Sequence, residues 1–181
     1  MAELVGQTIN RYKIISLLGE GGMGAVYKAH DITLQRDVAI KVMHAHFARQ
    51  SNFQARFLQE ARTAARLDHA SIVQVYDFGQ DRQSLYIVMK FIPGDNLEKM
   101  LRDMRQEGAW IPLNEAAGLI QQTAQALAYA HKQGVLHRDL KPGNIMIEPE
   151  PAGGLPYRPI ITDLGLAKLA AGGAFTQDGV S

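Results

Sequence analysis

The sequence contains no cysteine among its 181 residues. This absence excludes disulfides, thiolate metal ligands and a cysteine nucleophile, and it fits a reducing compartment such as the cytoplasm. Long hydrophobic runs are also missing, because no segment approaches the roughly 18 apolar residues of a membrane span. The start at Met1 lacks the basic and then apolar pattern of a signal peptide. We therefore expect a cytoplasmic protein with no membrane segment in this chain.

Neither sign of charge is in excess. Nineteen basic and eighteen acidic residues give a net charge of +1, so the chain has no general attraction for nucleic acid or anionic membranes. We expect no nucleic-acid partner, and other partners have to be inferred from individual sites. Hydrophobic residues make up 46% of the sequence, which is enough to bury a core as one domain or two small lobes.

The first half of the chain has the pattern of β-strands. Stretches rich in Val, Ile and Tyr alternate with Gly, Asp and Gln turns, and they predict strands at 12–18, 25–29, 38–43, 72–78 and 85–91. One helix interrupts the strands, and Ser51 with Gln54 forms its predicted capping box. Its apolar residues recur at helical spacing: Phe53, Phe57, Ala61, Ala64 and Ala65.

A helical composition follows the dipeptide Pro93-Gly94. A short helix is predicted to start at Asp95 or Asn96, and a longer one runs from about 114 to 132, with Gly134 as its stop signal. The predicted buried stripe of the longer helix is Leu119, Ile120, Thr123, Leu127 and Ala130. The sequence therefore predicts a mostly β lobe, a Pro-Gly hinge and a mostly helical lobe.

A glycine-rich stretch, with glycines at Gly19, Gly21 and Gly24, has the spacing GxGxxG. A dinucleotide-binding turn has the same spacing, but it needs a helix straight after the last glycine, whereas residues 25–29 form a predicted strand. Two strands joined by a glycine hairpin can lie over a triphosphate, because missing side chains let backbone amides approach the oxygens. Taken alone, the stretch leaves a nucleotide-binding hairpin and an ordinary turn open.

Three further motifs resolve this ambiguity. They are Val38-Ala39-Ile40-Lys41, His137-Arg138-Asp139-Leu140-Lys141-Pro142-Gly143-Asn144, and Asp163-Leu164-Gly165 after an apolar strand. A strand that ends with lysine is by itself usually only a strand with a solvated tip. Together with the glycine-rich stretch, the set resembles the signature motifs of bacterial Hanks-type (eukaryotic-like) serine/threonine protein kinases, with Leu164 in place of the usual phenylalanine.

The resemblance implies catalytic roles for four residues. Asp139 would accept or orient the proton of the substrate hydroxyl, and Lys141 would neutralise charge on the γ-phosphate. Lys41 would contact the α- and β-phosphates and would be held by Glu60, for which an exposed helix acid is the alternative interpretation. A lysine two residues after the aspartate is typical of serine/threonine kinases. His137 would pack in the core and orient the loop backbone rather than act as a base or metal ligand.

The resemblance also implies ATP and Mg²⁺ as cofactors. Asn144 and Asp163 would hold the metal. Met89 stands at the gatekeeper position, and the backbone of Lys90 and Ile92 would meet the adenine edge. The complete set of implied nucleotide contacts is Gly19, Gly21, Gly24, Val26, Ala39, Lys41, Met89, Lys90, Ile92 and Met146. For Val26, Ala39 and Met146 an ordinary core role is the alternative, and both roles are compatible.

The implied fold is α+β and protein-kinase-like. A five-stranded antiparallel N-lobe with one helix would occupy residues 1–92, and an incomplete, mainly helical C-lobe would occupy residues 93–181. No Ala-Pro-Glu triplet follows Asp163, so we expect a kinase truncated within the activation segment.

Two functions follow from this resemblance. The first is transfer of the ATP γ-phosphate to a protein serine or threonine, including autophosphorylation. The alternative is a catalytically weak Mg-ATP-binding module that forms a homodimer through its uncovered long helix, with exchange of C-terminal segments. Thr176 and Ser181 are candidate phosphorylation sites with Arg138 as a partner, and an unmodified tail is the alternative.

Overall fold

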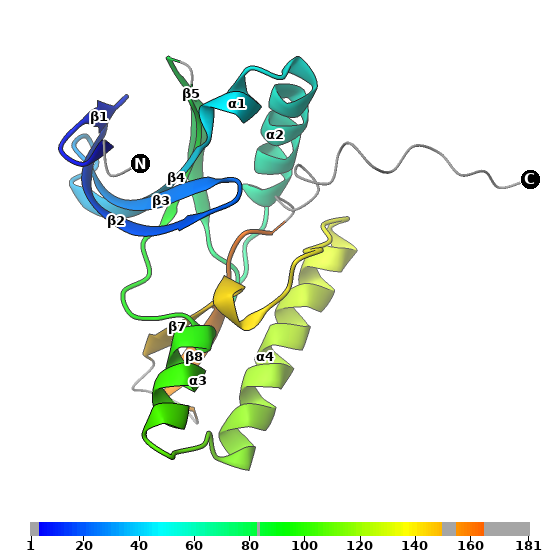
Figure 1. Ribbon diagram of the computed structural model, residues 1–181. Helices are drawn as coiled ribbons and strands as arrows, with labels where there is room; N and C mark the ends of the chain where they lie inside the picture. Colours follow the sequence, from blue (N-terminus) through cyan, green and yellow to red (C-terminus); the bar gives the residue numbers. More distant parts are fainter. Residues whose placement is uncertain (1–3, 83, 150–154, 165–181) are drawn as a thin grey trace, which may run out of the picture. The chain divides into compact units, whose positions relative to one another are not determined.

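The computed structural model describes residues 4–82, 84–149 and 155–164. The chain divides into two compact units, whose helices and strands are labelled in Figure 1. The first unit contains the described residues up to Arg66 and those from Gln74 to Phe91. The second contains Leu67–Val73 and the described residues from Ile92 onward. A segment from the first half of the chain therefore belongs to the second unit.

An antiparallel sheet forms the body of the first unit. Its six strands within the described residues follow the order β1-β2-β3-β4-β6-β5. They are β1 (Thr8–Ile9), β2 (Tyr12–Gly21), β3 (Gly24–Asp31), β4 (Arg36–Met43), β5 (Val75–Asp81) and β6 (Ser84–Lys90). The prediction of five strands missed β1, which has only two residues and pairs with Tyr12 and Lys13. A segment this short has no periodicity that a sequence pattern can reveal.

One face of this sheet carries the apolar core of the first unit. Alternate residues of a strand point to opposite faces, and residues directly opposite each other on neighbouring strands share a face. Tyr27, Ile40 and Val88 form one such row across β3, β4 and β6. We call the whole cluster the sheet core, and its buried members are Ile9, Tyr12, Ile14, Ala25, Tyr27, Ala29, Val38, Ile40, Val42, Tyr86 and Val88.

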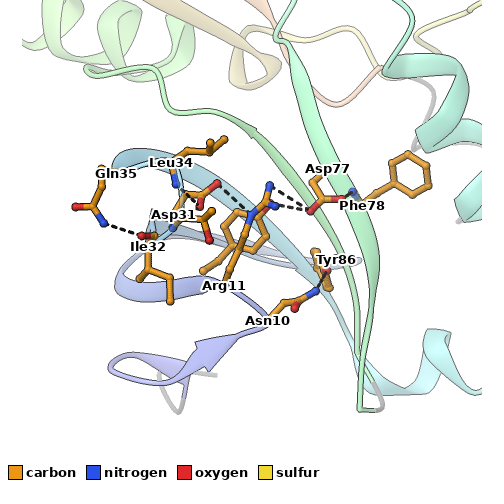
Figure 2. A network of polar contacts seen from close by, with 11 residues as sticks. Asn10, Arg11, Asp31, Ile32, Leu34, Gln35, Asp77, Phe78 and Tyr86 are labelled. Atoms are coloured by element: carbon orange, nitrogen blue, oxygen red, sulfur yellow. Dashed lines mark hydrogen bonds and ion pairs between the residues drawn. The ribbon is translucent and has the colours of Figure 1, made fainter.

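A polar network fixes one end of the same sheet (Figure 2). Arg11 lies 3.2 Å from the carboxylate of Asp31 and 3.9 Å from that of Asp77. Asp31 is fully buried and also accepts the backbone N–H groups of Thr33 and Leu34, each at 3.0 Å. Burial opposes ionisation of Asp31, but these N–H groups and the arginine outweigh it and lower the pKa of the carboxyl. The network thus joins the start of β2 to the β3–β4 hairpin and to β5.

Two helices accompany the sheet in the described part of the first unit, whereas the sequence predicted one. α1 (Ala45–Ala48) is a single turn too short to predict, and α2 (Ser51–Ala64) is the predicted helix. The buried residues of α2 are Phe53, Phe57 and Ala61. The predicted capping box is wrong. Gln50 rather than Ser51 is the cap residue, and the Gln54 side chain donates to a carbonyl of α1 instead.

The described residues of the second unit form two long helices and a short hairpin. Its elements are α3 (Leu97–Gln106), α4 (Leu113–Lys132), a 3₁₀ turn (Pro142–Asn144), β7 (Ile145–Pro149) and the antiparallel β8 (Tyr157–Ile161). Asn96 caps α3 by accepting the N–H of Lys99 at 2.9 Å, as predicted for a helix that starts here. The predicted strand 72–78 is divided, because Ile72 bridges to Ile161 in this unit while β5 begins at Val75.

The buried stripe of helix α4 agrees with the prediction at Leu119, Thr123 and Ala130, and the predicted Leu127 is partly buried. Its buried residues are Leu119, Thr123, Ala126 and Ala130. Ile120 was predicted to be buried but is 70% exposed. Ile120 is rotated by about 100° from Leu119 around the helix and lies beyond the edge of the buried face. Gly134 has φ +77° and ends the helix as predicted. Among the residues that the structure describes, no helix is long and apolar enough to cross a membrane.

Candidate active site

Strand register places four of the predicted nucleotide contacts on one face of the sheet. Val26 pairs with Lys41 across β3 and β4, and Ala39 pairs with Met89 across β4 and β6. Each of these residues alternates with members of the sheet core along its strand, so all four lie on the opposite face. The strands therefore bring together a lysine, a valine, an alanine and a methionine that are distant in sequence.

Among the described residues, Lys41 is the buried charged group of this face. It is only 8% exposed, although lysine is rarely buried in proteins. Glu60, its predicted partner, is half-buried on α2 in the same unit. Both residues make polar or electrostatic contacts in the structure, and a contact between the two stays a prediction.

The three glycines of the glycine-rich stretch are not equivalent. A Cβ at Gly24 would lie 2.1 Å from the carbonyl oxygen of Val42, whereas a Cβ at Gly19 or Gly21 would meet nothing within 4 Å. Gly21 and Gly24 pair across the hairpin that joins β2 to β3. The fold itself thus requires glycine at position 24. At the other two positions glycine leaves open space that a ligand can fill.

The remaining predicted nucleotide contacts are distributed over both units. Lys90 ends β6, and its N–H donates to the carbonyl of Gln74 at 2.9 Å. Ile92 belongs to the second unit and is buried. Met146 is half-buried on β7 and forms a bridge with Asn96.

In the second unit, three predicted residues of the catalytic loop lie together. Asp139 Oδ2 accepts from Lys141 Nζ at 2.8 Å and from Asn144 Nδ2 at 3.2 Å, and the same nitrogen donates to the Asp139 carbonyl at 2.8 Å. The hydrogen bond from Lys141 lowers the pKa of Asp139 despite some desolvation, and that from Asn144 adds to the effect. Asp139 in turn raises the pKa of Lys141. The pair therefore offers an ionised acceptor beside a permanent cation.

His137 and Thr162 connect this loop to Asp163. The ring of His137 is buried, its Nε2 lies 3.0 Å from the Thr162 carbonyl, and its Nδ1 lies 3.3 Å from the N–H of Asp139. The tautomer with the proton on Nε2 satisfies both contacts. The carbonyl of Asn144 accepts the N–H of Thr162 at 2.9 Å. The ring thus holds the loop backbone, and these bonds place Asp163, which has φ +59°, beside the loop.

The donor atoms at Asn144 and Asp163 fit magnesium. Both hydrogen bonds of the Asn144 side chain use its nitrogen, so its oxygen is the atom that can bind a metal. An amide oxygen and a carboxylate are hard ligands of the kind that Mg²⁺ prefers. Among the described residues no group of three or more His, Asp or Glu side chains could hold a metal. The other ligands would therefore be water and phosphate oxygens, as is usual for Mg²⁺.

The sequence patterns missed Glu98 on α3. A Cβ at Gly143 would lie 2.9 Å from the Oε2 atom of Glu98. The raised pKa of Lys141 is caused first by its hydrogen bond to Asp139 and then by nearby acidic charges, of which Glu98 is one. A glycine inside the catalytic-loop motif is the only sequence signal for this close approach. Gly165, Thr176 and Ser181 lie outside the described residues.

Comparison with known proteins gives consistent matches. A family profile described as protein kinase domain matches residues 12–180. The serine/threonine-protein kinase PknJ of Mycobacterium tuberculosis is 41% identical over 174 residues, which cover 96% of this chain and 28% of PknJ. PrkC of Bacillus subtilis is 40% identical over 146 residues, which cover 80% of this chain and 22% of PrkC. The chain thus spans less than a third of the length of these two curated relatives.

A solved structure has the same fold. The crystal structure of the PknI kinase domain of Mycobacterium tuberculosis matches with a TM-score of 0.76 and 30% sequence identity. The match covers 94% of this chain and 69% of the PknI chain. The described elements therefore correspond to a partial kinase fold.

Proposed function

The chain belongs to the protein kinase family, beside its bacterial serine/threonine members, and we propose that it transfers the γ-phosphate of ATP to a protein serine or threonine. One observation carries the proposal: Asp139 accepts hydrogen bonds from both Lys141 and Asn144. An ionised carboxylate can accept the proton of a substrate hydroxyl, and a neighbouring cation can stabilise charge on the phosphoryl group. The arrangement supports phosphoryl transfer better than mere nucleotide binding, which needs no such acceptor.

Each step of the transfer is assigned to a residue. Asp139 orients the substrate hydroxyl and receives its proton while an oxygen–phosphorus bond forms and the bond to ADP breaks. Lys141 neutralises charge on the transferred group. Lys41 binds the α- and β-phosphates and Glu60 holds it in place. Bound Mg-ATP would supply the phosphoryl group, with Asn144 and Asp163 as the protein's metal ligands.

The nucleotide contacts are proposed on both units. Residues 1–92 and 93–181 would form the two lobes. The side chains and backbone groups proposed to contact ATP are Gly19, Gly21, Gly24, Val26, Ala39, Lys41, Met89, Lys90, Ile92 and Met146. The common sheet face of Val26, Ala39, Lys41 and Met89 supports this assignment, because a flat adenine ring and its phosphates need one continuous surface.

Three measurements test the proposal. Calorimetry with Mg-ATP should show binding that is weakened in Asp163→Asn, since that substitution removes a carboxylate from the metal. Incubation with γ-labelled ATP and a serine/threonine peptide should label the peptide, and mass spectrometry of the chain itself should reveal any autophosphorylation. The absence of binding heat at millimolar nucleotide would refute the proposal, and binding without transfer would leave only a nucleotide-binding module.

Exposed apolar residues on α4 favour a second candidate function, a homodimerising Mg-ATP-binding module. Leu113 is 85% exposed and Ile120, seven residues later, is 70% exposed. A second copy could cover this surface, and exchange of C-terminal segments is one way to extend the contact. Light scattering at micromolar concentration should give a dimer mass that Ile120→Lys reduces to a monomer. The control Gln121→Lys adds the same charge to the same helix.

We also propose a cytoplasmic location and a protein substrate. ATP is available in the cytoplasm, and the absence of cysteine fits a reducing compartment. Fractionation of cells that produce the chain, followed by detection of labelled proteins in the same fraction, tests both statements.

A further inference from the structure

His44 contacts the glycine-rich hairpin at two points. Its backbone N–H donates to the Met23 carbonyl at 3.1 Å, and its ring Nε2 lies 3.0 Å from the Gly21 carbonyl oxygen. A carbonyl oxygen only accepts, so Nε2 carries the proton in this contact. The two carbonyls flank Gly22 in the turn between β2 and β3. His44 therefore contacts the turn of the hairpin on both sides of Gly22.

The position of His44 in the sequence connects the hairpin to the strand that carries the buried lysine. His44 comes directly after β4, three residues beyond Lys41. Met43 pairs with Gly24, so the end of β4 already lies against the hairpin. The histidine adds a side-chain bond where the strand pairing stops.

A ladder of rings continues from His44 to helix α2. The centroids of His44 and His46 are 5.8 Å apart, and those of His46 and Phe47 are 4.0 Å apart. Phe47 stacks on Phe53 at 4.7 Å, and Phe53 on Phe57 at 6.3 Å. Phe53 and Phe57 are buried residues of α2. These ring contacts form an unbroken series from His44 to the buried face of α2.

We propose that His44 is a positioning residue that holds the glycine-rich hairpin in place for Mg-ATP and couples it to α2, the helix of Glu60. This inference rests on the proposed nucleotide-binding function. The two bonds of His44 occupy carbonyl oxygens of the hairpin, whereas phosphate oxygens are bound by N–H groups. His44 and a bound nucleotide therefore do not compete for the same backbone atoms of the hairpin. A hairpin that is ordered before binding loses less conformational freedom when the nucleotide arrives.

Two substitutions separate the hydrogen bond from the ring ladder. His44→Phe keeps a ring next to His46 but removes the donor to Gly21, whereas His44→Gln keeps an N–H donor and removes the ring. In nucleotide-free protein, His44→Phe should speed hydrogen exchange in residues 19–24 about fivefold, the effect of one hydrogen bond. His44→Gln should leave this exchange within about twofold of the parent. Exchange in β5 and β6 should not change in either variant.

The ladder is tested by a third substitution, Phe47→Leu. In the parent it should speed exchange in residues 19–24 by up to about twofold, the same small change that loss of the ring causes in His44→Gln, because both substitutions interrupt the link to α2. In the His44→Gln background it should have no further effect, since the link is already broken there. Additive effects would overturn the coupling. The control His30→Phe alters a histidine of the same sheet whose ring contacts Asp37 and not the hairpin, and it should change nothing in residues 19–24.

Nucleotide affinity gives the functional readout. His44→Phe should weaken binding of a non-hydrolysable Mg-ATP analogue about fivefold in calorimetry. His44→Gln should bind the analogue with an affinity close to that of the parent. Unchanged hairpin exchange in His44→Phe, or faster exchange throughout the sheet, would overturn the inference. If the parent itself binds no nucleotide, the proposed function fails, whereas the exchange data still decide whether His44 clamps the hairpin.

Discussion

The two units position their predicted functional residues by different means. In the first unit, the register of β3, β4 and β6 places the predicted nucleotide contacts on one sheet face. In the second, side-chain hydrogen bonds among Asp139, Lys141 and Asn144 assemble the predicted catalytic group. Many backbone bonds maintain a register, whereas a loop depends on a few side chains. Substitutions should therefore affect stability or affinity in the first unit, and chemistry and local geometry in the second.

The largest expected effect is on chemistry in the second unit. Asp139→Asn removes the acceptor for the hydroxyl proton but keeps a side chain of the same size, so phosphate transfer should fall about 1000-fold. Mg-ATP affinity should stay close to that of the parent, because the proposed nucleotide contacts are elsewhere. Transfer of labelled phosphate to a peptide and calorimetry give the two values. Asp103→Asn is the control, because it alters an exposed acid on α3 in the same way. If Asp139→Asn kept phosphate transfer within tenfold of the parent, the proposed difference between the two units would be wrong.

The next effect concerns stability in the first unit. Gly24→Ala forces a methyl group against the Val42 carbonyl, so the free energy of unfolding should fall by about 3 kcal/mol. Gly21→Ala meets open space and should leave stability within about 0.5 kcal/mol, while it reduces Mg-ATP affinity by crowding the phosphates. Urea denaturation and calorimetry test the pair. Equal losses of stability in both variants would show that the glycine pattern is purely structural.

The sequence predicted long, periodic elements and motif residues better than local geometry. Four of the five predicted strands and α2 and α4 lie within a few residues of their predicted positions, because each has enough residues to display a period. The predicted strand 72–78 is divided. The prediction that Ile120 is buried was wrong. The buried stripe contains alanines such as Ala126, and these small side chains contribute little to the hydrophobic pattern of the sequence. The motif with Asp139 identified residues that lie together. The bond between His44 and Gly21 could not be predicted, since it joins residues whose proximity exists only after β4 has paired with β3.

A smaller effect on stability is expected in the second unit. Asn144→Ala removes two hydrogen bonds to Asp139 from a buried side chain, so the free energy of unfolding should fall by about 1–2 kcal/mol. The backbone bond from Thr162 to the carbonyl of residue 144 should survive. Urea denaturation measures the loss, and Asn114→Ala, at an exposed site on α4, is the control. A change in the exchange of β7 and β8 as large as that in the loop would contradict a local effect.

The smallest effect is a change in the ionisation of Asp139. The hydrogen bond from Lys141 lowers the pKa of Asp139 below its ordinary value of 3.8, so Lys141→Met should raise that pKa, and Asn144→Ala should raise it less. Because the folded-state pKa is depressed, the stabilisation from this contact is complete above the ordinary pKa and is lost as pH falls through the lowered value. Both groups are exposed, so solvent screening keeps the contribution small. Carboxyl NMR titration of the three proteins measures the order. A larger rise in Asn144→Ala than in Lys141→Met would mean that the amide, not the cation, keeps Asp139 ionised.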